Sequence, residues 1–367
     1  MFDIVIRIIL FAAAAVVCFC MVVEVLKVRV KRESAISDAG GIDEMVSVRV
    51  NSCTHSMQIR GRDRTRPVLL MLHGGPGNPL MPISHVFGRG LEAHFIVCHY
   101  DQRCAGKSYE PGMESGIVPT LDLMADDCLH IVMYLKERFG REKILLAGHS
   151  WGTVLGTTLV RRYPKHFLGY IGIGQLVDFV ENERICYDTV LRDVKMRRER
   201  RSEEELCRIA PYPDGDRIEP DKCMILRRHS TVYNFRKTTA GLAGAFRYVR
   251  SVLRSPAYSL RDTTVYAHNI FDTYRRIISR DLAEYSVYRY PLRYDVPMYF
   301  ISGEGDTMTP ISLSRRFYEQ LDCPDKQFFT VAGAGHSPML DRPGLFADIV
   351  ANRIYPRIML HERMKKT

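Results

Sequence analysis

The chain has 367 residues, of which 46% are hydrophobic and 26% are charged, a composition typical of a globular protein. This length exceeds the usual size of one domain, so we expect one core with an inserted subdomain. The net charge of +10 suits an anionic lipid surface, nucleic acid or an acidic substrate. Because the sequence contains no zinc finger, helix-turn-helix or RNA-binding aromatic signature, we exclude nucleic acid as the expected partner.

The amino-terminal residues form an apolar segment. Ile4 to Val23 carries Arg7 as its single charge, and about twenty residues of helix are long enough to cross a bilayer core. Acidic Asp3 near the start, and more apolar residues after a run of four alanines, favour an uncleaved anchor over a cleaved signal peptide. We therefore predict a transmembrane anchor with a basic flank at 1–32. A signal peptide, a buried core helix and a lipoprotein site at a cysteine in the segment are the alternatives.

The residues after the apolar segment predict its orientation. The positive-inside tendency keeps basic flanks in the cytoplasm, so we expect the main domain on the cytoplasmic side of the membrane. Eight cysteines scattered through that domain without CxxC spacing fit reduced thiols and indicate neither a disulfide framework nor a zinc site. The basic flank comprises Lys27, Arg29, Lys31 and Arg32.

Short apolar runs predict the strands of a sheet. Residues 45–50 and 55–60 alternate as a hairpin would, and 67–72 is a wholly apolar run of the kind buried inside a sheet. The helical spacing of apolar residues at 121–139 ends at Gly140. Such alternation of strands and helices predicts an α/β fold with a mostly parallel sheet and helices on both faces. Further strands are expected at 95–100, 143–147, 167–173, 298–301 and 327–331.

A different pattern separates two parts of this core, which we place at 45–175 and 291–367. Residues 176–290 show no clear buried strand and are rich in Arg and Tyr, so we predict an inserted helical cap. Residues 222–260 contain eight Lys or Arg residues and no acid. We interpret this basic stretch as a solvated or membrane-facing surface in preference to a site for an anionic substrate.

The strongest motif is GHSWG at 148–152, between the strand expected at 143–147 and a helix expected to begin near Thr153. A strand, a sharp turn and a helix make a nucleophile elbow, in which flanking glycines permit a strained turn around the serine. We therefore predict that Ser150 is a nucleophile. A purely structural turn is the alternative.

A serine hydroxyl needs a base to take its proton and an acid to orient that base. In elbow-bearing folds the chain order is Ser, then Asp or Glu, then His. His336, after the strand expected at 327–331, fits the base. Asp306, after the strand expected at 298–301, fits the acid, with neighbouring Glu304 as its rival. An N-terminal helix cap is the structural alternative for Asp306.

Stabilisation of an oxyanion requires backbone N–H donors. The glycine-rich loop HGGPG at 73–77 follows the buried strand at 67–72 and can supply one donor, for which we choose Gly75, with Gly74 as the alternative. The second donor expected is the N–H of Trp151, the residue after the nucleophile.

These motifs together resemble the proline iminopeptidase-like group of serine hydrolases. The resemblance rests on HGGPG, on DQR at 101–103 with a glycine and a serine shortly after it, and on GHSWG, in this order. GEGDTMTP and GAGHSPMLDRP resemble the acid and histidine loops of the same group. The likeness covers 45–175 and 291–350 well and the cap poorly. The group carries a glycine after DQR where this chain has Cys104, which puts the shape of that loop in doubt.

The resemblance implies an eight-stranded α/β-hydrolase fold with a helical cap and the triad Ser150, Asp306 and His336. In the group's peptidases, carboxylates of the cap bind the substrate's α-amino group. Glu181 and Glu183 are the matching candidates here, although a helix start that favours acids explains them equally well.

We thus expect a serine hydrolase that forms an acyl-enzyme and requires no metal or organic cofactor. The preferred substrate is a short peptide from which N-terminal proline or a similar residue is released. An ester or another amide is the alternative, and a non-catalytic binding protein of the same fold is a third interpretation.

Overall fold

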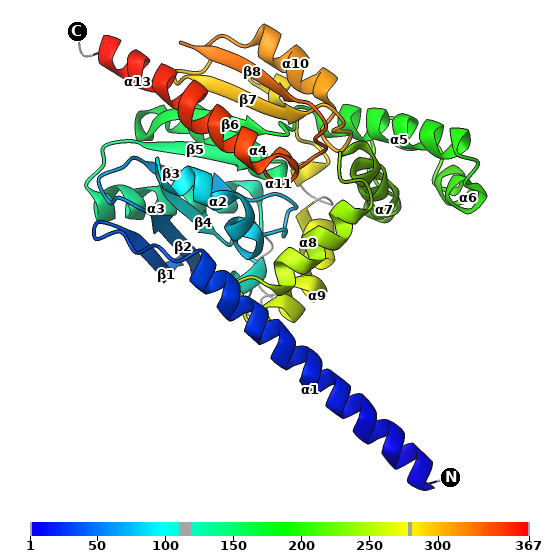
Figure 1. Cartoon of the computed structure of the whole chain (residues 1–367). Helices are drawn as coiled ribbons and strands as arrows, with labels where there is room; N and C mark the ends of the chain where they lie inside the picture. Colours follow the sequence, from blue (N-terminus) through cyan, green and yellow to red (C-terminus); the bar gives the residue numbers. More distant parts are fainter. Residues whose placement is uncertain (1, 110–118, 278–280, 366–367) are drawn as a thin grey trace.

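A computed structural model describes residues 2–109, 119–277 and 281–365 of the chain, and these form a mixed sheet covered by helices (Figure 1). The eight strands lie in the order β1-β2-β4-β3-β5-β6-β7-β8. β1 and β2 form an antiparallel hairpin, β2 pairs antiparallel with β4, and the remaining pairs are parallel. The predicted fold is confirmed. The strands are β1 (Ile42–Val50), β2 (Cys53–Gly61), β3 (Val68–Leu72), β4 (Ile96–Tyr100), β5 (Ile144–His149), β6 (Phe167–Ile173), β7 (Met298–Gly303) and β8 (Lys326–Val331).

Helices pack on both faces of the sheet, which explains why its central strands are apolar throughout. Alternate side chains of a strand point to opposite faces, so Leu70 and Leu72 join one core cluster and Leu69 and Met71 join the other. The core helices are α2 (Ser84–Glu92), α3 (Leu121–Phe139), α4 (Trp151–Arg162), α10 (Ile311–Gln320), α11 (Pro338–Asp341), α12 (Pro343–Asp348) and α13 (Tyr355–Met364). Shorter helical segments are η1 (Met81–Ile83), η2 (Gly106–Ser108), η4 (Pro164–His166), η6 (Val287–Arg289) and the π-helical η7 (Ile349–Ile354).

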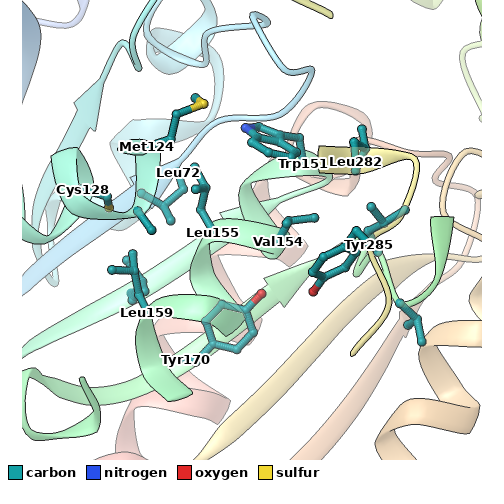
Figure 2. Packing of buried hydrophobic residues seen from close by; sticks show 14 of the residues in the cluster. Leu72, Met124, Cys128, Trp151, Val154, Leu155, Leu159, Tyr170, Leu282 and Tyr285 are labelled. Carbon is teal, nitrogen blue, oxygen red and sulfur yellow. The ribbon is translucent and has the colours of Figure 1, made fainter. Parts of the chain in front are cut away.

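The helix that follows β5 is embedded in the core from Trp151 to Val160. Figure 2 shows Val154, Leu155 and Leu159 of α4 packed among Leu72 and Tyr170. Each of these five side chains is fully buried. A helix anchored in this way fixes the position of the turn from which it starts.

Between β6 and β7 the described chain forms a group of helices beside one end of the sheet (Figure 1). The Asp178 carboxylate caps the first of them by accepting the N–H of Glu181 at 2.8 Å, as side chains do at helix starts. Apolar residues of this group, among them Val190 and Leu226, join the larger core cluster. The helices are α5 (Phe179–Met196), α6 (Arg200–Arg208), α7 (Pro220–Lys237), α8 (Ala243–Leu253) and α9 (Leu260–Ile277).

The amino-terminal helix α1 (Phe2–Glu33) extends away from the rest of the molecule (Figure 1). It is long and apolar enough to cross a membrane, and 6% of its most apolar stretch is buried. The alternative of a buried core helix is therefore wrong, whereas a membrane anchor and a signal sequence both fit. The last turn is docked on the body, because Arg89 Nη2 donates to the carbonyl of Glu33 at 2.6 Å and the Arg60 guanidinium donates to that of Ser34.

Candidate active site

The turn between β5 and α4 holds Ser150 in a strained conformation. Its backbone has φ 54° and ψ −120°, a region that residues with side chains rarely adopt. A Cβ added to Gly148 would lie 2.4 Å from the carbonyl oxygen of Gly152, and one added to Gly152 would lie 2.3 Å from that of Leu72. The turn can therefore form only with glycine on both sides of the serine. The helix begins at Trp151, two residues earlier than its expected start.

Asp306 and His336 lie in contact at the carboxyl ends of β7 and β8. His336 Nδ1 is 3.0 Å from Asp306 Oδ2 and 3.1 Å from Oδ1. The carboxylate also accepts the N–H groups of Met308 and Thr309, at 2.9 and 3.0 Å, and the Thr309 hydroxyl at 2.7 Å. Burial of the Asp306 carboxyl opposes its ionisation, but the facing His336 and these hydrogen bonds outweigh burial and lower its pKa. Asp306 is thus an anion that holds the imidazole.

Glu304, the rival acid, occupies a different position. Its side chain is exposed, and its carboxylate accepts the N–H of Gly333 at 3.4 Å. The contact with His336 is made by Asp306.

His149, the residue before the serine, joins the elbow to the histidine loop. Its Nε2–H donates to the backbone carbonyl of His336 at 2.9 Å, and the two rings lie 4.9 Å apart. Burial, together with the charge of His336, lowers the pKa of His149 to about 3. The ring therefore stays neutral and remains a donor. Sequence reasoning missed this residue, although its place beside Ser150 in GHSWG was a signal.

The loop after β3 passes directly over the serine. A Cβ added to Gly74 would lie 3.1 Å from Ser150 Cβ. Gly75 has φ 107°, a value that favours glycine. The N–H of Trp151 has no acceptor within its own helix, because Trp151 is the first residue of α4. Gly75 and Trp151 line the same pocket as Ser150, so the structure brings both expected oxyanion donors to the nucleophile.

That pocket is a cavity of about 810 Å³ between the sheet and the helices α5, α7, α8 and α9, within the usual range for small-molecule sites. The core contributes Ser150 and His336 to its lining, and the inserted segment contributes Arg227, Tyr274 and Leu282. Among the described residues, no group of three or more His, Cys, Asp or Glu side chains is placed to hold a metal ion.

Residues 67–218 match the family model of the alpha/beta hydrolase fold. A probable aminopeptidase of Bacillus subtilis is 26% identical over 320 residues, which are 86% of this chain and 98% of that protein. The crystal structure of a proline iminopeptidase-related protein from Thermus thermophilus covers 87% of this chain and 98% of its own, with a TM-score of 0.61 and 19% identity. A membrane phospholipase A described as a bacterial virulence factor covers 99% of both chains, with a TM-score of 0.59 and 19% identity.

The chain is an α/β hydrolase by fold. The predicted resemblance to the proline iminopeptidase-like group is also confirmed by these relatives.

The DQR motif of this α/β hydrolase links the two loops at the site. Gln102 Nε2 donates to the carbonyl of His73, and the N–H of Gln102 donates to His73 Nε2, both at 3.0 Å. Trp151 Nε1 donates to Gln102 Oε1, also at 3.0 Å. Gln102 therefore fixes the glycine-rich loop against the elbow. Sequence reasoning assigned it no role, although DQR follows a strand that ends at the same edge of the sheet.

Cys104, which replaces the group's glycine, has φ 62°. The loop of this α/β hydrolase thus keeps a backbone conformation that favours glycine, at a cost of about 1 kcal/mol for a residue with a side chain. The neighbouring Arg103 is buried and donates to Asp127 at 2.8 and 2.9 Å, which holds the loop from below.

Both cap carboxylates of the α/β hydrolase are paired with arginines. Glu181 is half-buried and accepts from Arg316 Nη1 at 3.0 Å, outside the pocket lining that the described residues form. Glu183 is fully buried, forms an ion pair with Arg227 and accepts the Tyr212 hydroxyl at 2.7 Å. Of this ion pair, Arg227 lines the pocket and Glu183 does not.

Proposed function

We propose that this α/β hydrolase is a serine hydrolase that works through an acyl-enzyme on Ser150. One observation carries the proposal: the strained Ser150 lies in one cavity with an imidazole that a buried aspartate holds. A serine, a base and an orienting acid in this arrangement perform acyl transfer on unrelated folds.

Acylation begins when Ser150 Oγ attacks the substrate carbonyl carbon while His336 takes the hydroxyl proton. The resulting oxyanion accepts hydrogen bonds from the N–H groups of Gly75 and Trp151, where one such donor contributes about 10²-fold to 10³-fold in rate. As the tetrahedral intermediate collapses, the bond to the leaving group breaks and His336 gives its proton to that group. A water molecule then attacks the acyl carbon while His336 takes one of its protons; as this second intermediate collapses, the bond to Ser150 Oγ breaks, His336 returns the proton to that oxygen, and the acid is released.

Asp306 has the role of fixing the imidazole and stabilising its protonated form during each step. It suits this role because it is ionised despite burial and accepts from the side of His336 that faces away from the reacting proton. The chemistry needs neither a metal ion nor an organic cofactor.

For the substrate we prefer a short peptide from which N-terminal proline or a similar residue is released. The support is the Bacillus subtilis relative, which is named a probable aminopeptidase and aligns over 98% of its length. On this proposal Glu181 and Glu183 are the candidates that bind the substrate's α-amino group. Glu183 would do so by exchanging Arg227 for the substrate cation, and Glu181 by exchanging Arg316.

An ester or non-peptide amide is the second candidate, and one specific observation favours it. A pocket that selects amines requires an anionic side chain in its lining. This pocket is lined by Arg227 instead, and Glu183, which does not line it, forms an ion pair with that arginine. The membrane phospholipase A of the same fold is named for an ester substrate. A non-catalytic binding protein of the hydrolase fold is the least supported candidate, because ligand binding alone does not require the strained backbone conformation of Ser150.

We further propose that residues 1–32 anchor the protein and that residues 176–290 act as a cap on the core parts 45–175 and 291–367. The helix α1 continues without a break from the apolar stretch into its docked last turn, which favours retention of the segment. The basic residues Lys27, Arg29, Lys31 and Arg32 favour a cytoplasmic position for the catalytic domain.

Hydrolysis of matched substrates by the full-length protein in detergent tests the substrate preference. The set comprises proline and alanine anilides with free or acetylated amino termini and a short acyl ester. An aminopeptidase should prefer the free-amine proline anilide, and Glu183→Gln should then raise its KM more than that of the acetylated anilide. Turnover of the ester alone would reject the peptidase assignment and keep the serine mechanism.

A further inference from the structure

The cap helix α8 exposes an apolar stripe along one of its sides. Leu242, the residue at its start, is 57% exposed, Phe246 is 71% exposed and Val249 is 54% exposed. Residues spaced by four and then three positions lie on one face of a helix. Exposed apolar residues are ordinary when scattered, but a continuous stripe indicates an interaction surface.

The other residues of α8 indicate which kind of partner the apolar stripe would contact. Gly244, Tyr248 and Ser251 face the pocket. Arg247 and Arg250 also line the pocket, on the part of the helix next to the stripe, and no acidic residue occurs from position 222 to 260. Apolar residues bordered by arginines are typical of helices that lie in the interface of an anionic membrane.

The helix α8 lies on the same side of the molecule as the candidate membrane helix α1. Figure 1 shows α8 and α9 on the side of the body from which α1 extends. Val30 and Glu33 of α1 line the same pocket as Arg250 and Arg254 at the end of α8. The two helices therefore border one mouth of the cavity.

The length of α1 gives the height of this mouth above a bilayer. Its apolar stretch ends at Val23, ten residues before Glu33, which corresponds to about 15 Å at the rise of an α-helix. The headgroup layer on each side of a bilayer core is about 5–8 Å thick. Glu33 thus lies about 7–10 Å beyond the headgroups, a gap that a helix beside the mouth, about 10–12 Å across with its side chains, can bridge.

We infer that α8 lies in the headgroup interface of the bilayer that α1 spans, with Leu242, Phe246 and Val249 inserted toward the acyl chains. The mouth between α1 and α8 then opens at the lipid surface and admits amphiphilic acyl substrates directly from the bilayer. The placement of α8 does not depend on the proposed function, whereas the substrate route rests on the serine hydrolase proposed above.

Tryptophan fluorescence in vesicles tests the placement of α8. Full-length Phe246→Trp protein is reconstituted into vesicles of phosphatidylcholine and phosphatidylglycerol with or without brominated acyl chains, which quench nearby tryptophan. The unchanged protein gives the background, because its one tryptophan, Trp151, is buried. Leu360→Trp is the matched control, since Leu360 is 60% exposed on α13, which lies on the opposite side of the molecule from the direction of α1 (Figure 1).

Quenching of Phe246→Trp above background, with none for Leu360→Trp, is the expected result. Fluorescence of Phe246→Trp that brominated lipid leaves unchanged would overturn the placement and assign the stripe to a protein contact, such as a second copy of the chain.

The substrate route is tested by comparing two esters in the same vesicles. One is a long-chain nitrophenyl ester dissolved in the bilayer, and the other is a short-chain nitrophenyl ester in water. The triple variant Leu242→Ser, Phe246→Ser and Val249→Ser should lose about tenfold in rate on the embedded ester, because its apolar contact with lipid is removed. Its rate on the soluble ester should match that of the unchanged protein and of Leu360→Ser.

Equal rates on the embedded ester for the variant and the unchanged protein, or an equal loss on both esters, would overturn the route. Failure of the unchanged protein to hydrolyse either ester would instead reject the serine hydrolase proposal, and the route with it. The quenching experiment would still decide where α8 lies.

Discussion

The Nε2–H of His149 donates to the backbone carbonyl of His336 at 2.9 Å. His149 ends strand β5 next to the nucleophile, and His336, the base, lies in the loop after β8, so this hydrogen bond joins the two segments whose side chains must exchange a proton. The neutral state of His149 follows from burial, which lowers its pKa to about 3.

Replacement of His149 by alanine should therefore slow acylation without unfolding the protein. We expect kcat/KM to fall up to about 100-fold, the loss that follows when reacting groups are misplaced by about 1 Å. Steady-state kinetics of His149→Ala measures this, with His130→Ala, an exposed histidine on α3, as the control. A rate equal to that of His130→Ala would show that the base loop does not depend on the hydrogen bond.

The carboxylate that orients the base is expected to dominate catalysis. Asp306→Asn keeps the shape of the side chain but removes the charge and favours the wrong imidazole tautomer, so kcat should fall about 10⁴-fold. Glu304→Gln should leave kcat unchanged, because Glu304 is exposed and contacts Gly333. The opposite ranking of these two variants would assign the acid role to Glu304.

The elbow glycines should limit stability as well as activity. A Cβ on Gly152 meets the carbonyl oxygen of Leu72 at 2.3 Å, a backbone atom that cannot move aside cheaply. We expect Gly152→Ala to lower the free energy of unfolding by about 3 kcal/mol. Gly344→Ala is the control, since nothing lies within 4 Å of a Cβ there. Urea unfolding compares the two variants, and equal midpoints would contradict the steric argument.

A buried pair beneath the DQR loop should make stability depend on pH. Burial opposes a charge on His55, but its contact with Asp127 prevails and raises the pKa of His55 to about 9, from the ordinary 6.5. Because the pKa of His55 is higher in the folded state, its protonated form stabilises the fold fully below about pH 6.5. This stabilisation is lost as the pH rises through about 9. The urea concentration at the unfolding midpoint should thus decrease as the pH is raised from about 6.5 to about 9.5. In His55→Gln this decrease should be smaller. An equal decrease of the urea midpoint in His55→Gln would show that other titratable groups cause the pH dependence.

Much of this arrangement could be predicted from local sequence. Strands buried on both faces are recognisable as apolar runs such as 67–72. The helix at 121–139 is recognisable from the spacing of its apolar residues and from Gly140, at which it ends. Nucleophile, base and acid could be nominated because each follows such a strand, and the carboxyl ends of parallel strands meet at one edge of the sheet.

Contacts between distant segments could not be predicted in the same way. Nothing in the local pattern indicates that Glu183 pairs with Arg227, because the two residues come from different cap helices and no periodicity relates them. The bonds of Gln102 to His73 and Trp151 likewise appear only when three loops are brought together. These contacts determine what the pocket presents to a substrate, which is why substrate class is the least predictable property.

Labelling by a fluorophosphonate probe shows whether Ser150 is an activated nucleophile, because the probe reacts with a serine only where a working base activates it. The full-length protein should be labelled, Ser150→Ala should not be, and His336→Ala should be labelled far more slowly, with all three proteins showing the same thermal unfolding midpoint. Equal labelling of Ser150→Ala, or no labelling of the unchanged protein, would rule out Ser150 as the activated nucleophile.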